Sequence, residues 1–314
     1  MMTDAPEILH YAAFTDDPNG GNPAGIVLDA AGLDDEAMQR IAAETDFSET
    51  AFVTGTEGGA RVVRYFSPIA EVPFCGHATV ATAIALAERE GPGTMRFRTS
   101  VGEITVETTA APGGAGGMRA AFTSVDTDLA PIPEFVLDGL LVLLGLDRTE
   151  LEERFPPRLA FAGNWHPVLV LAGRKSFDGF GFDPGAMRAF MDAQGWNATV
   201  TVLHPLDAPR ATPKRFEARN LFPVGRISED PATGSAAAAF GGYLRALGLV
   251  TPPARVVIEQ GRHVGRPGEL AVDIPERGGI VVSGRRCRSA DAGVRVQRGG
   301  RDRLTPRCVI GRRG

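Results

Sequence analysis

"EVPFCGHATVATAIAL" (residues 71–86) and "EDPATGSAAAAFGGYL" (residues 229–244) are two versions of one pattern. Each begins with glutamate, passes a proline and a glycine, and continues into a run of small residues that is typical of a buried helix. At one constant offset the glutamates, prolines and glycines coincide, as do two alanines and a final leucine. Because the shared positions keep their order, the two stretches predict an internal duplication.

Three further pairs of stretches flank these runs in the same order: "GNPAGIVL" with "GNWHPVLVL", "RYFSP" with "RNLFP", and "GEITVE" with "GELAVD". Each half therefore combines alternating strands with an alanine-rich helix, predicted at residues 76–90 and 234–247. The expected fold class is α+β, with two pseudo-symmetric halves, each a curled, mostly antiparallel sheet around a central helix. We place the halves at residues 1–126 and 127–284, with the linker near the prolines of residues 123–135.

The loops "PFCGHAT" and "EDPATGSA" precede the two predicted helices and should face each other across a cleft. The first N–H groups of a helix have no intrahelical partner, and the helix dipole places partial positive charge there. Two such helix starts in one cleft would suit a small carboxylate. The alternative is that Thr79 and Ser235 only cap their helices, since both residue types are preferred caps.

The composition predicts a globular protein without an export signal or a membrane span. The N-terminus lacks a basic and an apolar segment, and the longest apolar block, residues 135–146, contains Asp138 and is too short to cross a bilayer. We expect that block to form a buried helix. The three cysteines have no ligand-like spacing, so neither a disulfide framework nor a zinc site is indicated. These features favour a cytoplasmic protein.

The charge is unevenly distributed along the chain. The formal net charge is −5, but the last thirty residues, 285–314, contain ten arginines and two aspartates. The remaining acidic body argues against a nucleic-acid partner, and only this tail could bind polyanions. We treat residues 285–314 as an atypical tail with three open explanations: a frame-shifted terminus, a natural basic arm, or a divergent final strand.

The motifs "GNPAGIVL", "FSETAFV", "EVPFCGHAT", "EDPATGSA" and "EQGRHVGRPGEL" together resemble the PhzF-like family of phenazine-biosynthesis-type isomerases. The resemblance extends from about Phe14 to Gly284. It implies the diaminopimelate-epimerase-like fold, a cofactor-independent enzyme and a homodimer. The best-known activity of the family is the isomerisation of trans-2,3-dihydro-3-hydroxyanthranilate through a proton shuttle.

The resemblance also implies roles for individual residues. Glu49, in the SET motif, would be the general acid and base, and its apolar neighbours would raise its pKa. His77 would assist it and Asp230 would orient the substrate. The groups expected to bind the substrate carboxylate are Gly76, Gly234 and Ser235. From the residues alone, Glu49 could equally be a strand-edge glutamate, His77 a structural histidine and Asp230 a turn residue before proline.

Two other functions remain as alternatives: an amino-acid epimerase or racemase, and a small-molecule binder without activity. A two-thiol racemase is disfavoured because the position equivalent to Cys75 in the second half is Thr233, whose hydroxyl is too weak an acid. Cys75 is therefore expected to be a small packing residue. Lys175 and Lys214 lie outside the motif loops and the histidines are scattered, so no cofactor and no metal are expected.

Overall fold

The computed structural model describes residues 6–110, 118–207, 212–224 and 227–288. The explanations offered for the arginine-rich tail concern residues that, from 289 onward, lie outside this described part. Within the described ranges, no helix has both the length and the apolar composition that crossing a membrane would require.

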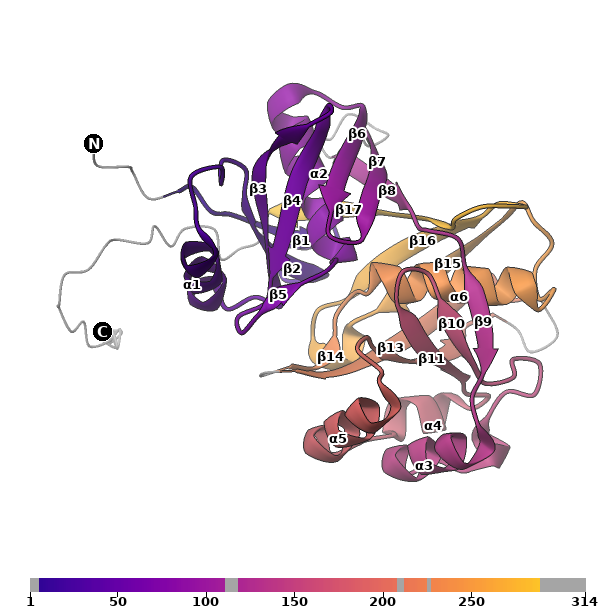
Figure 1. Cartoon of the computed structure of the whole chain (residues 1–314). Coiled ribbons are helices and arrows are strands. Elements are labelled where there is room, and N and C mark those ends of the chain that lie inside the picture. Colours follow the sequence, from indigo (N-terminus) through magenta and orange to yellow (C-terminus); the bar gives the residue numbers. More distant parts are fainter. Residues whose placement is uncertain (1–5, 111–117, 208–211, 225–226, 289–314) are drawn as a thin grey trace, which may run out of the picture.

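Seventeen strands of the described chain pair into one large sheet (Figure 1). Those of the first part of the chain are β1 Leu9–Ala13, β2 Asn22–Val27, β3 Glu49–Glu57, β4 Ala60–Phe66, β5 Glu71–Val72, β6 Thr94–Thr99, β7 Gly102–Ala110 and β8 Met118–Thr123. The others are β9 Asp128–Pro131, β10 Arg158–Phe161, β11 Trp165–Val170, β12 Val200–Pro205, β13 Arg215–Val224, β14 Ile227–Asp230, β15 Ala254–Gln260, β16 Gly268–Ile274 and β17 Val281–Arg288.

Most of the strand pairs are antiparallel, and the parallel ones recur in matching places. Strands β2 and β3 are parallel, as are β4 and β6; in the later part of the chain β11 and β12 are parallel, as are β13 and β15. Strand β17 pairs with β16 through residues 281–283, with β8 through residues 281–285 and with β1 through residues 286–288. It therefore joins the strands of the two parts, and it continues to Arg288, four residues past Gly284.

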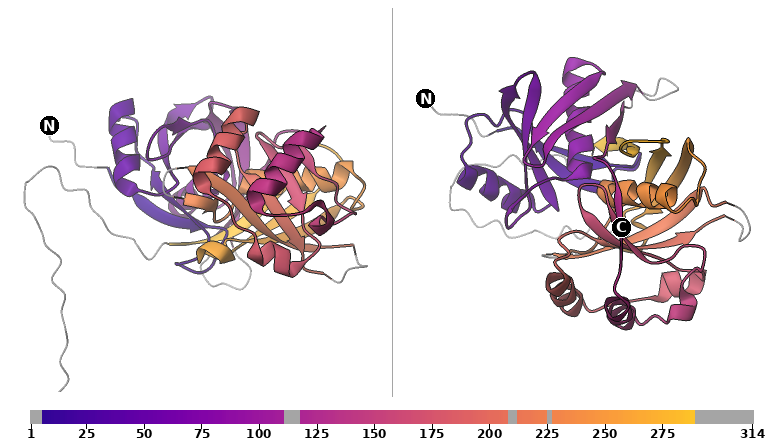
Figure 2. Two further views of the ribbon diagram at one scale, coloured as in Figure 1. Left: turned by 90° about the horizontal axis from the view of Figure 1, so that it is seen from below. Right: turned by 45° about the vertical axis from the view of Figure 1, so that its right-hand side comes forward.

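Six α-helices and two short 3₁₀ helices complete the described structure: α1 Asp35–Thr45, α2 Gly76–Glu90, α3 Glu134–Leu144, η1 Arg148–Glu150, α4 Arg174–Gly179, α5 Pro184–Gln194, α6 Gly234–Ala246 and η2 Arg262–Val264. Helix α2 contacts β1, β2, β3, β7 and β8, whereas α6 contacts β9, β10, β11 and β16 (Figures 1 and 2). Every residue of α2 from Gly76 to Ala87 is buried. Small side chains make this possible, because they let strands approach the helix on several sides.

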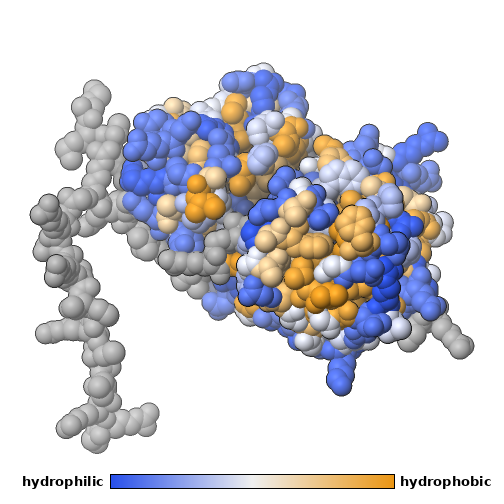
Figure 3. All heavy atoms as spheres, turned by 60° about the horizontal axis from the view of Figure 1, so that its bottom comes forward, coloured by the Kyte–Doolittle hydropathy of each residue, from blue (hydrophilic) through white to orange (hydrophobic). Residues whose placement is uncertain are grey.

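The apolar block at residues 135–146 forms a helix, but only one face of it is buried. Leu137, Leu140 and Leu141 are buried in an apolar cluster that α3 forms with α4, α5 and strands of the sheet. Phe135 and Val142, on the other face of the helix, are 77% and 78% exposed. Apolar side chains gather on this side of the molecule, where α3 to α5 lie (Figure 3). The expectation of a buried helix is therefore wrong for its outer face, because α3 covers the sheet from one side and nothing in the described chain covers α3.

The expected linker also contains more structure than its prolines suggest. Residues 128–131 form β9, which pairs with β10 through four residues. The stretch between β8 and β9 is therefore short, and the chain enters its next strand almost at once.

Candidate active site

A cavity of about 270 Å³ lies where the beginnings of α2 and α6 meet. Its volume is just below the range that is typical of small-molecule sites. It is lined from both parts of the chain, and all six residues predicted for the site contribute to it: Glu49, Gly76, His77, Asp230, Gly234 and Ser235. Residues more than 150 positions apart in the sequence are thus brought to one small space.

The two helix starts are in direct contact. A Cβ atom on Gly76 would lie 3.6 Å from the Cα of Gly234 and equally far from the backbone nitrogen of Ser235. The residues preceding the helices are Cys75 and Thr233, and neither side chain caps its helix. The first residues of both helices therefore line the cavity without a side-chain cap, and uncapped helix starts can bind anions.

The capping alternative fails for Thr79. Its Oγ1 donates to the carbonyl oxygen of Cys75 at 2.7 Å and lies 2.6 Å from the Tyr65 hydroxyl. The first contact lies within the first turn of α2 and the second joins α2 to β4, so Thr79 stabilises the packing of α2 against β4. Ser235 is also inside its helix, one residue after Gly234, and it lines the cavity.

Glu49 is the first residue of β3, beside β2 in a parallel pair. Its side chain is only 12% exposed, and its Oε2 lies 3.3 Å from Nε2 of His77. Burial raises the pKa of Glu49, and hydrogen bonds from Ser48 and Cys75 oppose that rise without cancelling it. The group is thus a buried carboxyl on a cavity wall, which is a typical setting for a general acid and base.

His77 is the second residue of α2 and is 4% exposed. Its Nδ1 lies 3.0 Å from Nδ2 of Asn22, and its Nε2 lies 3.3 Å from the Ser48 hydroxyl. Burial lowers the pKa of His77 to about 3. The imidazole is therefore neutral at physiological pH, and it meets Glu49 as a hydrogen-bonding group and not as a cation.

Asp230 is the last residue of β14, and both of its carboxyl oxygens accept hydrogen bonds. Oδ1 accepts a hydrogen bond from Nδ2 of Asn22 at 2.6 Å, and Oδ2 accepts one from the Thr233 hydroxyl at 2.6 Å. Burial, reinforced by the charge of Glu49, raises the pKa of Asp230 to about 7. Two carboxyl groups in one cavity disfavour each other's charged forms, so the site resists holding two negative charges.

Cys75 is buried in the apolar core, as expected of a packing residue. It also lines the cavity, and its Sγ lies 3.2 Å from Nδ1 of His77. Burial and the charge of Glu49 raise the pKa of the Cys75 thiol well above its usual range. A thiol that stays protonated is a poor base, and its counterpart Thr233 donates its hydroxyl hydrogen to Asp230.

Comparison with known proteins identifies the family. The sequence profile described as "Phenazine biosynthesis-like protein" (PhzC-PhzF) matches residues 11–289. The chain belongs to the PhzF-like family.

Relatives and solved structures agree with this assignment. An uncharacterized isomerase of Deinococcus radiodurans is 35% identical, over 85% of this chain and 86% of its own length. The trans-2,3-dihydro-3-hydroxyanthranilate isomerase of Pseudomonas chlororaphis is 30% identical, over 82% of this chain and 87% of its own. The crystal structure of a PhzF-family protein from Bacillus anthracis superposes with a TM-score of 0.76 at 26% identity, covering 89% and 95% of the two chains. The PhzF-like chain is thus an isomerase or epimerase with the α+β fold of its family, a large sheet with a few helices.

Asn22 is not among the residues that the sequence predicts for the site, although it lies in the repeated "GNPAG" stretch. Its side-chain nitrogen lies within hydrogen-bond distance of His77, of Asp230 and of the carbonyl oxygen of Ala232. It therefore ties α2 of the PhzF-like fold to the loop before α6. Gln260 is not among those residues either; its Nε2 donates to the Asp230 carbonyl oxygen at 2.6 Å, and its Oε1 accepts from the Thr233 N–H.

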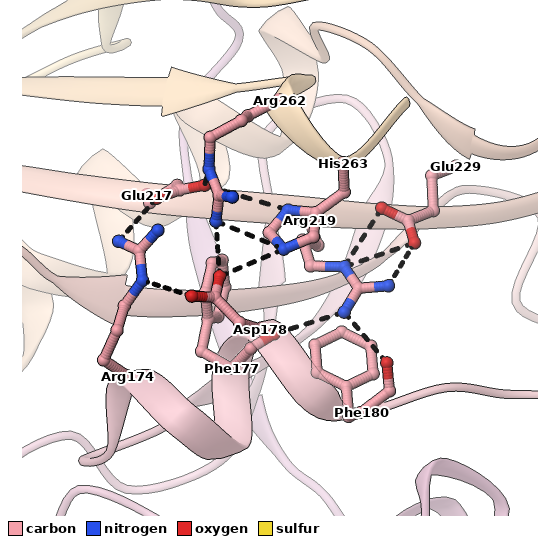
Figure 4. A network of polar contacts seen from close by, with 9 residues as sticks. All are labelled: Arg174, Phe177, Asp178, Phe180, Glu217, Arg219, Glu229, Arg262 and His263. Atoms are coloured by element: carbon pink, nitrogen blue, oxygen red, sulfur yellow. Dashed lines mark hydrogen bonds and ion pairs between the residues drawn. The ribbon is translucent and has the colours of Figure 1, made fainter. Parts of the chain in front are cut away.

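A second set of contacts fixes the strand that carries Asp230 (Figure 4). Glu229, the residue before it, pairs with Arg219 of β13, and the two side chains are 10% and 8% exposed. Arg219 also donates to the carbonyl oxygens of Phe177 and Phe180, and its guanidinium lies over the Phe180 ring. This buried network anchors β14 to β13 and α4, and so positions Asp230, the residue after Glu229, at the cavity.

Two groups of side chains in the described structure have the spacing of metal ligands. The first is Glu49, Cys75 and His77, which belong to the site itself. The second is Asp178, Glu217 and His263, and Figure 4 shows its carboxylates paired with Arg174 and Arg262. The two arginines already neutralise that group, so its chemistry is that of an ion-pair network.

Proposed function

We propose that this PhzF-like protein is a cofactor-independent isomerase in which Glu49 moves a proton on a small carboxylated substrate. The observation that carries the proposal is the placement of Glu49, which lines the cavity, is nearly buried and has its pKa raised by that burial. A carboxyl group that titrates above its usual range can both take and give a proton near neutrality.

The chemistry needs no other reactant. The Glu49 carboxylate removes a proton from a substrate carbon, and the electrons of the broken C–H bond move into a neighbouring conjugated system. The protonated Glu49 then returns that proton to a different carbon, where the new C–H bond forms. The substrate changes only in the position of its hydrogen and double bond. The relative named trans-2,3-dihydro-3-hydroxyanthranilate isomerase provides a first candidate of this type.

The substrate carboxylate would lie at the helix starts. The N–H groups beside Gly76 and Gly234 and the Ser235 hydroxyl supply donors and partial positive charge. His77 would hold Glu49 and the substrate in line, and Asp230 would accept a hydrogen bond from a substrate hydroxyl or amino group.

The internal duplication supports a finer view of the fold. We propose that residues 1–126 and 127–284 are two pseudo-symmetric halves, each a curled sheet around α2 or α6, because the same parallel strand pairs recur in both. The family resemblance further implies a homodimer, which light scattering of the purified protein would test, and a cytoplasmic location.

The two alternatives are weaker. A thiol-dependent epimerase needs an ionisable thiol, whereas the pKa of Cys75 is raised and the second half supplies Thr233 instead. A binder without activity has no need to bury Glu49 and Asp230 side by side in one cavity at a cost in stability.

Deuterium exchange tests the proposal. Trans-2,3-dihydro-3-hydroxyanthranilate and a panel of unsaturated carboxylates are incubated in D₂O with the wild type, with Glu49→Gln and with Glu44→Gln, an exposed glutamate on α1 as the matched control. We expect the wild type and the control to introduce deuterium into at least one compound, and Glu49→Gln to be slower by ~10²–10⁴-fold. Equal exchange by all three proteins, in every compound, would refute the role of Glu49.

A further inference from the structure

His166 is a buried histidine of the cavity that the proton shuttle does not use. It is the second residue of β11, is 0% exposed, and lines the same cavity as Glu49 from the other part of the chain. Its Nε2 is one of only three buried side-chain nitrogen or oxygen atoms in the described residues that have no hydrogen-bond partner. Buried polar atoms are nearly always paired, so an unpaired one in a cavity wall indicates a partner that arrives with a ligand.

The other ring nitrogen of His166 has two oxygen atoms within hydrogen-bond distance. Nδ1 lies 3.2 Å from the carbonyl oxygen of Thr199 and 3.0 Å from its hydroxyl oxygen. That hydroxyl donates its hydrogen to Oδ1 of Asn220 at 3.0 Å, and the hydroxyl of Thr201 donates to the same oxygen at 2.6 Å. Because the one hydroxyl hydrogen of Thr199 goes to Asn220, both Thr199 atoms near His166 are acceptors.

This arrangement fixes the tautomer of the ring. With two acceptors beside it, Nδ1 carries the hydrogen, so Nε2 holds a lone pair when the ring is neutral. Burial lowers the pKa of His166 to about 4, which keeps the ring neutral at physiological pH. The unpaired atom is therefore a hydrogen-bond acceptor and needs a donor.

The position of His166 in the sheet supports a role in the site. In the parallel pair β2 and β3, Ala24 lies opposite Glu49. In the corresponding pair β11 and β12, Val168 lies opposite Thr201, and two residues earlier the same register brings His166 beside Thr199. The pair of His166 and Thr199 thus lies two residues before the first pair of this ladder, close to the strand ends that correspond to those near Glu49 in the earlier part.

We infer that Nε2 of His166 accepts a hydrogen bond from a hydroxyl or amino group of the substrate. The inference rests on the proposed function and narrows its substrate class: a small carboxylate that also carries an O–H or N–H donor. The carboxylate lies at the helix starts and the donor reaches across the cavity to His166, which fixes the orientation of the substrate relative to Glu49. His166 is a binding residue that selects for the donor; it moves no proton.

Four aromatic carboxylates serve as probes: benzoate, 3-hydroxybenzoate, anthranilate and 3-hydroxyanthranilate. Their dissociation constants are measured by calorimetry for the wild type, His166→Asn and His166→Gln. Asparagine can still donate to Thr199 but places no acceptor at the Nε2 position, whereas glutamine can place its amide oxygen there. We expect the wild type to prefer at least one donor-bearing probe over benzoate, and the preference to fall ~10-fold in His166→Asn but not in His166→Gln.

A measurement that needs only the wild type protects the result against poor folding of a variant. In wild-type protein with ¹⁵N-labelled histidine, the long-range spectrum of His166 should show hydrogen on Nδ1 only, and the Nε2 resonance should shift with the preferred donor-bearing probe but not with benzoate. The inference is overturned if Nε2 carries the hydrogen, if the wild type shows no preference for a donor, or if the preference is the same in His166→Asn. Loss of deuterium exchange in every compound, with the preference intact, would instead refute the proton shuttle and leave His166 as a binding residue.

Discussion

Asp230 makes the stability of the protein depend on pH in a direction opposite to that of most aspartates. Its pKa is raised from about 3.8 to about 7, first by burial and second by the charge of Glu49. Well below pH 3.8 both the folded and the unfolded chain hold the proton, and this carboxyl contributes no pH dependence. Between pH 4 and 7 the unfolded chain releases the proton more readily, so stability falls as the pH rises, and above pH 7 the loss is complete.

The size of this loss follows from the two pKa values. Each pKa unit corresponds to ~1.4 kcal/mol, so a carboxyl group that titrates about three units too high destabilises the folded state by about 4 kcal/mol at pH 8. Asp230→Asn removes the ionisation but keeps the shape of the side chain. We therefore expect the free energy of unfolding of the variant, relative to the wild type, to increase by about 4 kcal/mol between pH 4 and pH 8.

Urea unfolding at a series of pH values measures this difference. The lowered pKa of His77 changes stability in the opposite sense below pH 6.5, but it is common to both proteins and cancels. Asp126→Asn, at an exposed aspartate, controls for the loss of a carboxyl group as such. In a Glu49→Gln background the effect of Asp230 should become smaller without vanishing, because burial is the larger cause. A difference that stays within about 1 kcal/mol across this pH range would refute the reasoning.

Four further substitutions test the structure around the site. Gly234→Ala should lower the free energy of unfolding by about 1–3 kcal/mol, because the new Cβ would lie 3.0 Å from the buried ring of Phe122. Gly76→Ala is the control, since its Cβ would meet only ordinary contacts at 3.6 Å. Urea unfolding compares the two variants. Glu229→Gln should cost about 3 kcal/mol by the same measurement, since it leaves the 8%-exposed Arg219 without its carboxylate. Cys75→Ser should retain isomerase activity to within about 10-fold; a loss comparable to that of Glu49→Gln would restore a thiol mechanism.

The repeated helix motif could be predicted from the sequence because small residues are informative about packing. Gly76 and Gly234 mark the starts of α2 and α6, as expected, and the alanines that follow are buried as the pattern indicates. The outer face of α3 could not be predicted in this way. Phe135 and Val142 are as apolar as their buried neighbours, and only the position of the sheet decides which face of a helix is covered.

The sequence predicts which residues belong to the candidate site better than it predicts the hydrogen bonds between them. Glu49, His77 and Asp230 were selected by motif, and the structure places them at one cavity. Asn22 and His166 lie in the two matching "GN" stretches, yet their importance depends on hydrogen bonds over 208 and 33 positions of sequence. No local pattern encodes such contacts, because they depend on how strands from distant parts of the chain are brought together.

The proposed duplication has a chemical consequence that goes beyond the fold. Where the first half has Glu49 at the start of β3, the second has Val200 at the start of β12, and where the first has Cys75 before its central helix, the second has Thr233. The only strong acid–base side chain at these four positions is therefore on one side of the cavity. A symmetric pair of bases can remove a proton from one face of a carbon and return one to the other face, which inverts a stereocentre. If Glu49 is the one base, as proposed, and Asp230 only orients the substrate, the proton returns on the face from which it came. The proposed mechanism therefore favours moving a proton between carbons over racemisation.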